Sequence, residues 1–396
     1  MNGLPDRTLR LALSALLAVA GLAGCTLAPP DAAHTLNVLA GSELKDLEQF
    51  LPDIQQHTGV KLSLSYVGTL EGAERIANGD TADAAWFSHG KYISLLPGAG
   101  SRIVASEKIM LSPVILGVKR SAAQRLGWTG SKPVTWKDIA DRSADGSFHF
   151  AMTNPAASNS GMTALIGVAS ALAGSSDALD AGTIDVAGLK RFFVGQALTA
   201  GSSGFLADDY VREQDRLDGI VNYESVLLGL NAGGKLHEPL TLVYPSEGIV
   251  TADYPFMLLN AAKKDAWQAL VDYLRTPDVQ KRIMTDTSRR PAVPGVPLDP
   301  RFGTATLIEL PFPSKLSTID TLITTYLDQA RRPASAVFVL DVSASMEGQR
   351  LNGLKAALRA LTGTDPSLTG KFARFRAHEE VTFIAFSGDI VDERTF

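Results

Sequence analysis

Three small side chains that carry oxygen, Asp341, Ser343 and Ser345, come directly after a short apolar run in the stretch VFVLDVSASM. The run, residues 337–340, is mostly β-branched or aromatic, and this pattern predicts a strand that is buried on both faces. After Gly348, leucines and alanines recur at the spacing of one helix face. The three oxygens are therefore expected at the carboxyl end of a strand, where open α/β sheets bind ligands. One carboxylate and two hydroxyls suit a hard cation such as Mg²⁺.

The DVSAS sequence resembles the D-x-S-x-S metal-site motif of von Willebrand factor A domains, with Asp341, Ser343 and Ser345 as the first three metal-site residues. The commonest form of the motif has Gly where Ala344 stands, which should matter little because only the flanking serines bind. The resemblance implies that residues 335–396 begin a Rossmann-like domain, which binds protein partners through the cation. The alternative interpretation is a polar strand-to-helix loop with a Ser-rich helix cap.

The second strand of this domain is expected at residues 381–386, VTFIAF. Thr364 and Thr382 stand in the wrong places for the family's fourth metal residue, a Thr, and its later Asp has no counterpart here. We therefore expect a partial domain that binds Mg²⁺ weakly, because three oxygens from one loop complete only part of an octahedral shell. A half-built sheet should also leave apolar surface exposed around Phe338 and Phe383.

Arg7 and Arg10 precede an apolar run that is too short to span a bilayer comfortably and that ends in LAGC. These features describe an export signal, and the ending resembles the bacterial lipobox, in which Cys25 would become a lipidated N-terminus. Cys25 is the only cysteine, so it cannot form an internal disulfide. We expect a signal peptide over residues 1–24, a lipidated tether over residues 25–34, and a protein anchored to the extracytoplasmic face of the cell membrane. The alternative is an ordinary signal peptide with an unused thiol.

The chain then alternates between strand and helix patterns. A strand at 35–40 is followed by a helix beginning near Ser42, and a strand at 60–67 is followed by a helix beginning at Gly68-Thr69. Helix N-termini offer free backbone N–H groups and the positive end of the helix dipole, so they bind anions and polar oxygens. Each hydroxyl taken alone is explained as a helix cap. Together, at neighbouring strand ends, they favour a binding cleft.

The stretch LNVLAGSELKDL, followed by TGVKLSLSYVGTLEGAERIANGDTADAAWFS, is similar to the opening of bacterial periplasmic solute-binding proteins, most of all the molybdate-binding type. The similarity continues in SPVILGVKR and ADYPFMLLNAAKKDAWQALVDYLRTPDVQKRI, and it covers roughly residues 35–290. It implies an α/β, two-lobed clam-shell of type II, in which Ser42, Gly68 and Thr69 contact the ligand. The lobes are expected at about residues 35–116 together with 247–290, and at about residues 117–246.

The second lobe is expected to contribute Ser158 and Ser160, before a long apolar helix, and Tyr223, at the end of a strand. In the molybdate-binding type, a Tyr that contacts the ligand lies near that point. Glu224 departs from this type, because a carboxylate in the cleft would repel an oxyanion. Further aromatic residues exceed what a bare tetrahedral anion needs: Trp86, Phe87 and Tyr244. We therefore expect only a small polar or anionic ligand.

The formal net charge of −5 over 396 residues is mild and argues against nucleic acid as a partner. Beyond the export signal, no second apolar run is long enough to cross a membrane. Prolines spaced by threes follow residue 290 and favour extended polyproline structure, and a helix is expected at residues 316–327. Residues 291–334 are therefore predicted to form a linker that keeps the solute-binding domain apart from the domain that begins at residue 335.

An enzyme is the competing class of protein. The six histidines show no metal-binding spacing such as H-E-x-x-H, and no G-x-S-x-G nucleophile motif is present. We expect no catalysis and no catalytic residue. Two functions remain. The first is a membrane-anchored lipoprotein that couples ligand binding in the clam-shell to metal-dependent protein binding or adhesion through the A module. The alternative is the substrate-binding receptor of an ABC uptake transporter for a molybdate-like oxyanion.

Overall fold

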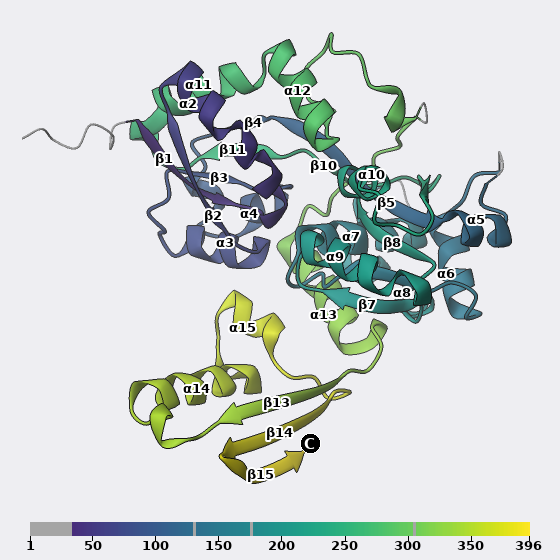
Figure 1. Cartoon of the computed structure of the whole chain (residues 1–396), viewed down its shortest axis with the longest axis vertical. Coiled ribbons are helices and arrows are strands. Elements are labelled where there is room, and N and C mark those ends of the chain that lie inside the picture. Colours follow the sequence, from purple (N-terminus) through teal and green to yellow (C-terminus); the bar gives the residue numbers. More distant parts are fainter. Residues whose placement is uncertain (1–33, 130–131, 175–176, 304–305) are drawn as a thin grey trace, which may run out of the picture. The chain divides into compact units, whose positions relative to one another are not determined.

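A five-stranded sheet forms the core of the first lobe (Figure 1). The structure is a computed structural model that describes residues 34–129, 132–174, 177–303 and 306–396. The strand order of this sheet is β2-β1-β3-β11-β4. The strands are β1 (Thr35–Ala40), β2 (Lys61–Tyr66), β3 (Ala84–Trp86), β4 (Ala105–Lys108) and β11 (Pro255–Leu258). β1 is parallel to β3, whereas β11 is antiparallel to both β3 and β4. The sheet is therefore completed by a strand that returns from much later in the chain, as the similarity to solute-binding proteins implies.

The helices of the first lobe follow the apolar pattern of the sequence. They are η1 (Ser42–Phe50), α2 (Leu51–Thr58), α3 (Thr69–Ala77), α4 (Lys91–Leu95), η2 (Gly100–Arg102), η5 (Ala261–Lys263), α11 (Lys264–Leu274) and α12 (Pro277–Thr287). Leu44, Leu47 and Phe50 form the buried face of η1. α2 ends at Gly59, whose φ of 70° lies in the left-handed region that glycine adopts without steric cost. The predicted helix after Ser42 is confirmed, although its first nine residues form 3-10 turns.

A seven-stranded sheet forms the core of the second lobe. Its main order is β10-β5-β8-β6-β7, and both β9 and β12 also pair with β5. The strands are β5 (Met110–Lys119), β6 (Phe150–Thr153), β7 (Gln196–Ala200), β8 (Gly219–Tyr223), β9 (Leu240–Val243), β10 (Thr251–Ala252) and β12 (Arg290–Pro291). β5 follows β4 after a single residue, so the chain passes from the first sheet straight into the second. The crossing strand predicted from SPVILGVKR is confirmed.

Three helices of the second lobe, α7 (Asn159–Ala173), α9 (Ser203–Glu213) and α10 (Glu224–Ala232), follow its parallel strands β6, β7 and β8. The others are α5 (Arg120–Leu126), α6 (Trp136–Ala144), η3 (Ala181–Thr183), α8 (Val186–Phe193) and η4 (Gln214–Arg216). All residues of α7 from Asn159 to Ser170 are buried, as expected for a helix that is apolar on every side. β6 and β7 are parallel, and α7 and α9 follow them. These two helices therefore begin at the same edge of the sheet.

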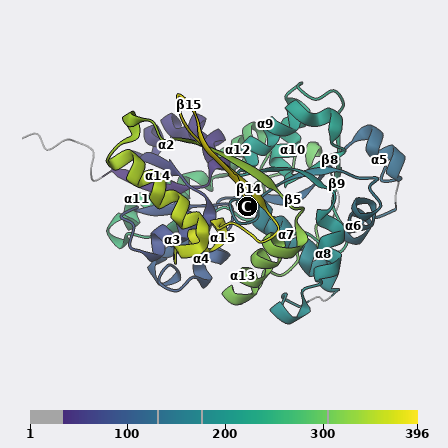
Figure 2. The same ribbon diagram turned by 90° about the horizontal axis from the view of Figure 1, so that it is seen from below.

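The segment predicted to be a linker packs into the protein instead. Ile249 and Glu309 form a parallel bridge, and α13 (Leu316–Thr325) continues as the π-helical turn η7 (Tyr326–Ala330). The predicted helix is confirmed, but it does not separate two modules, because its apolar face lies in the main core. Tyr326 donates a hydrogen bond to Gln196 Oε1 at 3.1 Å, and α13 lies beside α7 (Figure 2). The residues 36–396 form one compact unit.

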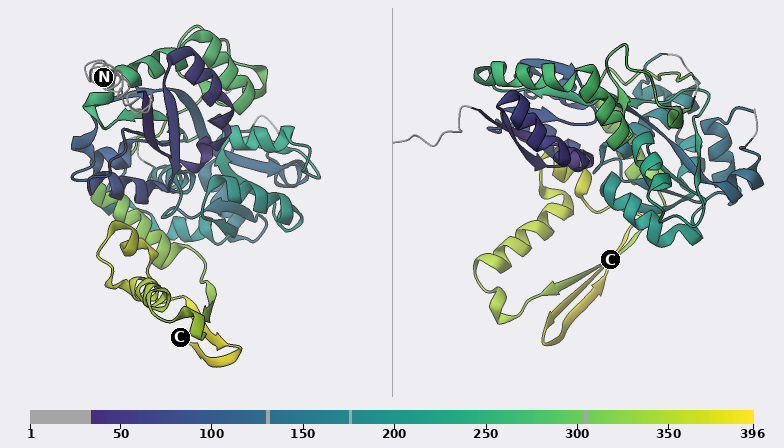
Figure 3. Two further views of the ribbon diagram at one scale, coloured as in Figure 1. Left: turned by 60° about the vertical axis from the view of Figure 1, so that its left-hand side comes forward. Right: turned by 45° about the horizontal axis from the view of Figure 1, so that its top comes forward.

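The C-terminal module consists of a three-stranded sheet with helices (Figure 3). It contains β13 (Ser335–Asp341), η8 (Ala344–Met346), α14 (Gln349–Arg359), η9 (Ala360–Thr364), α15 (Leu368–Ala373), β14 (Glu380–Ser387) and β15 (Asp389–Thr395). The short η6 (Pro300–Phe302) belongs to the preceding segment. β13 is parallel to β14, and β14 is antiparallel to β15. The strand, metal-motif loop and helix thus follow in the predicted order, and the second strand lies where it was expected.

The first strand of this module is not buried on both faces as predicted. Val337 and Val339 are 61% and 63% exposed. Phe338 points to the other face, where its ring stacks on that of Phe383 with the centroids 5.3 Å apart and meets Phe375 edge-on. The exposure that we expected around Phe338 and Phe383 therefore falls mainly on the two valines. The reason is the two-residue period of a strand: only one face of β13 meets aromatic side chains from the rest of the module.

In the part of the chain that the structure describes, no helix is both long enough and apolar enough to cross a bilayer. The predicted signal peptide, residues 1–24, and Cys25 lie outside the described residues.

Candidate functional site

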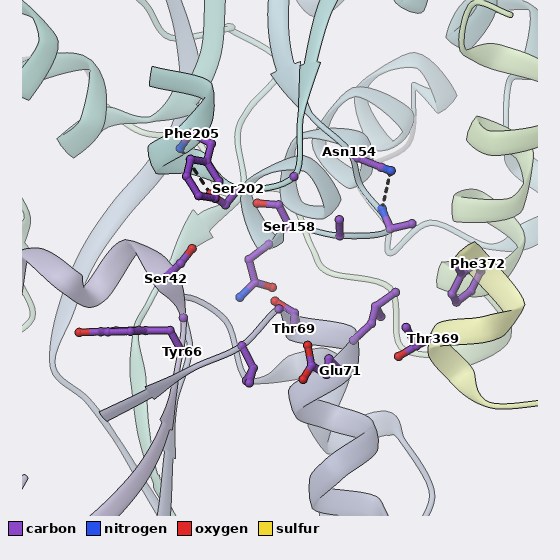
Figure 4. Close-up of a pocket in the computed structure, with 18 of the residues that line it drawn as sticks. Ser42, Tyr66, Thr69, Glu71, Asn154, Ser158, Ser202, Phe205, Thr369 and Phe372 are labelled. Carbon is purple, nitrogen blue, oxygen red and sulfur yellow. Dashed lines mark hydrogen bonds between the residues drawn. The ribbon is translucent and has the colours of Figure 1, made fainter. Parts of the chain in front are cut away.

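A cavity with a volume of about 450 Å³ lies between the two lobes. Its wall contains the starts of η1 and α3 from the first lobe and of α7 and α9 from the second. Figure 4 shows Ser42, Thr69, Ser158 and Ser202 around this space, one residue from each of these helix starts. The first N–H groups of a helix have no partner within the helix, and they carry the positive end of its dipole. The cavity is therefore suited to a solute with hydrogen-bond acceptors.

Four of the six residues predicted at the ligand line the cavity: Ser42, Gly68, Thr69 and Ser158. None of the three hydroxyls caps its own helix. Glycines occupy the N-cap positions of η1 and α3, and Ser158, the N-cap residue of α7, makes no capping hydrogen bond. Its Oγ lies 3.2 Å from Ser160 Oγ instead. The alternative explanation of these residues as helix caps therefore does not apply in the structure.

The structure places the other two predicted residues, Ser160 and Tyr223, away from the cavity wall. Ser160 is fully buried, with its Oγ 2.9 Å from Thr153 Oγ1 and 2.8 Å from Ser203 Oγ. Tyr223 is also fully buried, and its hydroxyl donates to Ser88 Oγ at 2.7 Å. The helical turn of α7 directs Ser160 toward the end of β6, whereas Tyr223 reaches across to the first lobe. We therefore correct the prediction: these two hydroxyls hold the lobes and helices in place.

The sequence led us to expect a free carboxylate of Glu224 in the cleft, but the structure does not place one there. Glu224 is completely buried at the start of α10, where Arg290 Nε donates to one carboxylate oxygen and Nη2 to the other, both at 2.7 Å. Tyr244 also donates its hydroxyl to this carboxylate. Trp86 and Phe87, expected as ligand-facing rings, are buried in the core. None of these residues lines the cavity, so they give no information about the chemical class of the ligand.

The charged groups on the cavity wall are acidic. Glu43 and Glu71 line it, and no lysine or arginine is among the described lining residues. Burial raises the pKa of Glu43, against the opposing charge of Arg289, which lies in the core and donates from Nη2 to the Glu43 carbonyl at 2.8 Å. The wall therefore combines partial positive charge from helix N-termini with carboxyl groups, and it does not offer a cationic side chain to a bare anion.

Two buried polar atoms on this wall have no hydrogen-bond partner within the described chain. They are Oε1 of Glu43 and Nδ2 of Asn159, the first residue of α7, which is only 6% exposed. An unsatisfied buried polar group costs about 1–3 kcal/mol. A solute that offers an acceptor near Asn159 and a donor near Glu43 would recover this cost.

Sequence reasoning missed several lining residues: Glu43, Tyr66, Asn154, Asn159, Ser202 and Phe205. Ser202 could have been found, because it stands between a strand and a helix as Ser42 and Thr69 do. It is the N-cap of α9, and its Oγ accepts from the Phe205 N–H at 3.4 Å. Glu43 and Asn159 could also have been found, because they directly follow Ser42 and Ser158. Tyr66, Asn154 and Phe205 carry no such signal, since tertiary packing alone brings them to the cavity.

The three residues of the metal motif lie together in the loop after β13. Asp341 Oδ1 accepts from the Ser343 N–H at 2.9 Å, and the hydroxyl oxygens of Ser343 and Ser345 are 3.0 Å apart. The hydrogen bonds from Ser343 lower the pKa of Asp341, so the carboxylate is ionised at neutral pH. The donor set is the oxygen set that Mg²⁺ prefers. No group of three or more His, Cys, Asp or Glu side chains in the described residues is arranged to hold a metal.

The fold and cavity define a class of protein. A two-lobed α/β clam-shell, crossed by β5 and closed by β11, with a polar cavity between the lobes, is the architecture of an extracytoplasmic solute-binding protein. A model of the bacterial extracellular solute-binding protein family matches residues 36–286, and the chain belongs to this family. A comparison with curated proteins finds no match.

Solved structures with the same fold bind different solutes. The periplasmic binding protein AfuA from Actinobacillus pleuropneumoniae, with fructose-6-phosphate bound, has a TM-score of 0.56 at 16% identity over 75% of this chain and 98% of its own. A periplasmic thiamin-binding protein has a TM-score of 0.59 at 12% identity over 75% and 96%. The sulfate-binding protein SubI from Mycobacterium tuberculosis H37Rv has a TM-score of 0.51 at 20% identity over 72% and 96%. At these identities the similarity shows the fold alone.

Proposed function

We propose that this protein is the receptor of an ABC uptake transporter and binds a small polar solute in the interlobe cavity. The observation that carries the proposal is the convergence of four helix N-termini on one cavity, whose wall also holds the unpartnered amide of Asn159. Hydrogen-bond donors that are already oriented bind acceptor oxygens without rearrangement. The receptor would close its lobes on the solute by a hinge motion.

Within this class, an organic solute is favoured over the bare oxyanion of the molybdate-binding type. Glu43 and Glu71 place carboxyl groups on the wall, and the rings of Tyr66 and Phe205 add surface that a tetrahedral ion does not use. The volume of about 450 Å³ is also within the range of about 300–1,000 Å³ that is usual for organic ligands. A solute with several hydroxyl oxygens on a carbon frame suits this wall.

A screen with fructose 6-phosphate, thiamin, sulfate and molybdate tests the proposal. We expect the melting temperature of the full chain to rise with an organic compound, because a ligand at 100 times its Kd stabilises the native state by about 2.7 kcal/mol. Calorimetric titration then gives the affinity and stoichiometry. Saturable binding of molybdate or sulfate, with no response to either organic compound, would contradict the preference for an organic solute.

We further propose that the protein is a lipoprotein anchored through Cys25 on the extracytoplasmic face of the cell membrane. The support is the LAGC ending of the export signal. Cys25→Ala is expected to move the protein from the membrane fraction to the soluble fraction, since stable anchoring needs the acyl chains that a lipoprotein carries. Fractionation followed by immunoblotting measures this shift, with Cys25→Ser as a second variant. Membrane retention of both variants would rule out lipid attachment at this residue.

We propose a second candidate function for the C-terminal module, metal-dependent protein binding or adhesion. We propose that Asp341, Ser343 and Ser345 supply three oxygens to a Mg²⁺ ion and that an acidic group of a protein partner completes the shell. The clustering of these oxygens in one loop supports this proposal. An ionised carboxylate and two hydroxyls would hold the cation, whose charge would attract the partner's acidic group.

Weak Mg²⁺ binding that depends on Asp341 is the expected result of calorimetric titration. Asp341→Ala should abolish the heat of binding, because it removes the only formal charge among the three oxygens. Asp365→Ala is the matched control, since Asp365 Oδ1 accepts from the Ser367 N–H at 2.9 Å in the same kind of turn. Equal Mg²⁺ binding by the wild type and Asp341→Ala would exclude this loop as the site.

A further inference from the structure

One wall of the solute cavity comes from the C-terminal module. Thr369, Phe372 and Ala373, all in α15, line the cavity together with residues of the two lobes, and Figure 4 shows Thr369 and Phe372 facing this space from the side opposite Ser42 and Tyr66. Phe372 is 5% exposed and belongs to the main hydrophobic core. A helix more than 290 residues away from Ser42 in the sequence is therefore part of the same site.

A carboxylate of the first lobe holds the start of this helix. Glu74, in α3, accepts from the Leu368 N–H at 2.8 Å through Oε1, and from the Thr369 N–H at 3.1 Å and the Thr369 hydroxyl at 2.7 Å through Oε2. Hydrogen bonds to a charged acceptor are among the stronger ones in proteins. Thr69, at the other end of α3, lines the cavity as well. The same helix thus forms one wall of the cavity and fixes another.

A second contact ties α15 to the helix that leads into the module. Lys371 Nζ pairs with Asp320 Oδ2 at 2.7 Å, and Tyr92 of the first lobe donates to the other oxygen of Asp320 at 3.4 Å. Arg376, which follows α15, is buried and donates to Asp328 Oδ1 at 2.9 Å. α15 is therefore held on both sides, by α3 and by α13 with η7.

We propose that α15 is a third wall of the solute site, docked on the first lobe through Glu74, and that undocking it opens the cavity. Thr369 then contacts the solute as a hydrogen-bonding residue and Phe372 as an apolar one, so the C-terminal module takes part in solute recognition. Coupling of this kind is reciprocal. A solute that touches α15 stabilises the docked position of the module, and undocking of the module lowers the affinity for the solute. The statement about solute contact rests on the proposed receptor function, whereas the docking does not.

Hydrogen exchange on the full chain, without any solute, tests the docking. Glu74→Ala removes the acceptor of the Leu368 and Thr369 amides, and exchange across residues 368–371 is expected to rise about tenfold or more. Arg75→Ala is the matched control, because it also breaks a charged hydrogen bond of α3, the one to Asp80 at 2.8 Å, and Arg75 is not among the residues that line the cavity. Thr369→Ala removes one partner from the other side and should give a smaller increase. Unchanged exchange in Glu74→Ala would overturn the docking.

A fluorescent dye and the solute screen test the third wall. Undocking exposes Phe372, so 8-anilinonaphthalene-1-sulfonate should fluoresce more with Glu74→Ala than with the wild type or Arg75→Ala. Equal fluorescence would mean that the cavity does not open. In the four-compound screen described above, the compound that binds the wild type should bind Glu74→Ala about tenfold more weakly. An unchanged affinity would exclude contact between α15 and the solute. If none of the four compounds binds, the exchange and dye results still decide the docking, so the two proposals fail separately.

Discussion

Replacing Arg290 by alanine is expected to lower the free energy of unfolding by about 3–5 kcal/mol. Arg290 is 13% exposed and donates two hydrogen bonds to Glu224, which is not exposed at all. The variant keeps the buried carboxylate but removes its cation, and an uncompensated buried charge is one of the most expensive defects in a folded protein. The pair joins the start of α10 to β12, so the loss also loosens the region where the chain passes between the lobes.

Urea unfolding followed by tryptophan fluorescence measures this change, with Arg191→Ala as the control. Arg191 pairs with Asp141 at 2.7 Å, but both side chains are well exposed, at 55% and 39%. Exposed pairs contribute about 0–1 kcal/mol. Equal losses in the two variants would show that the buried pair stabilises the protein no more than a surface pair does.

Gly68→Val is expected to weaken solute binding about tenfold or more, equivalent to about 1.4 kcal/mol, with only a modest loss of stability from the change at the N-cap of α3. A Cβ built on Gly68 lies 3.0 Å from the carbonyl oxygen of Ala157 in the opposite lobe. The methyl groups of valine extend further and hold the lobes apart at the cavity. The φ of Gly68 is −69° with ψ at 159°, an extended conformation that valine adopts readily, so the backbone itself is not strained.

Calorimetric titration with the solute found in the screen measures the affinity, and Gly204→Val is the control. A Cβ on Gly204, near the start of α9, meets nothing within 4 Å. The control variant should therefore bind as the wild type does, apart from a modest loss of helix stability. If Gly68→Val binds the solute as tightly as the wild type does, the approach of Gly68 to Ala157 is not needed for closure.

Local sequence patterns determined much of the solute-binding fold. The strand-to-helix steps at Ser42 and Thr69 are encoded by neighbouring residues, since an apolar run, a glycine and an amphipathic helix follow in order. The structure has helices beginning at both positions, and it places both residues on the cavity wall. The family model matches residues 36–286, which agrees with the range of roughly 35–290 that the sequence similarity to solute-binding proteins indicated.

Only the tertiary structure decided which way the side chains at these positions point and what they meet. Ser158 and Ser160 look equivalent in the sequence, but two residues along a helix turn the side chain by more than half a circle, so one faces the cavity and the other the core. Glu224 looked like a repulsive charge because its partner, Arg290, lies 66 residues away. Glu74 and Thr369 are 295 residues apart. Hydrogen bonds between distant segments leave no periodic pattern in the sequence, and packing alone brings their partners together.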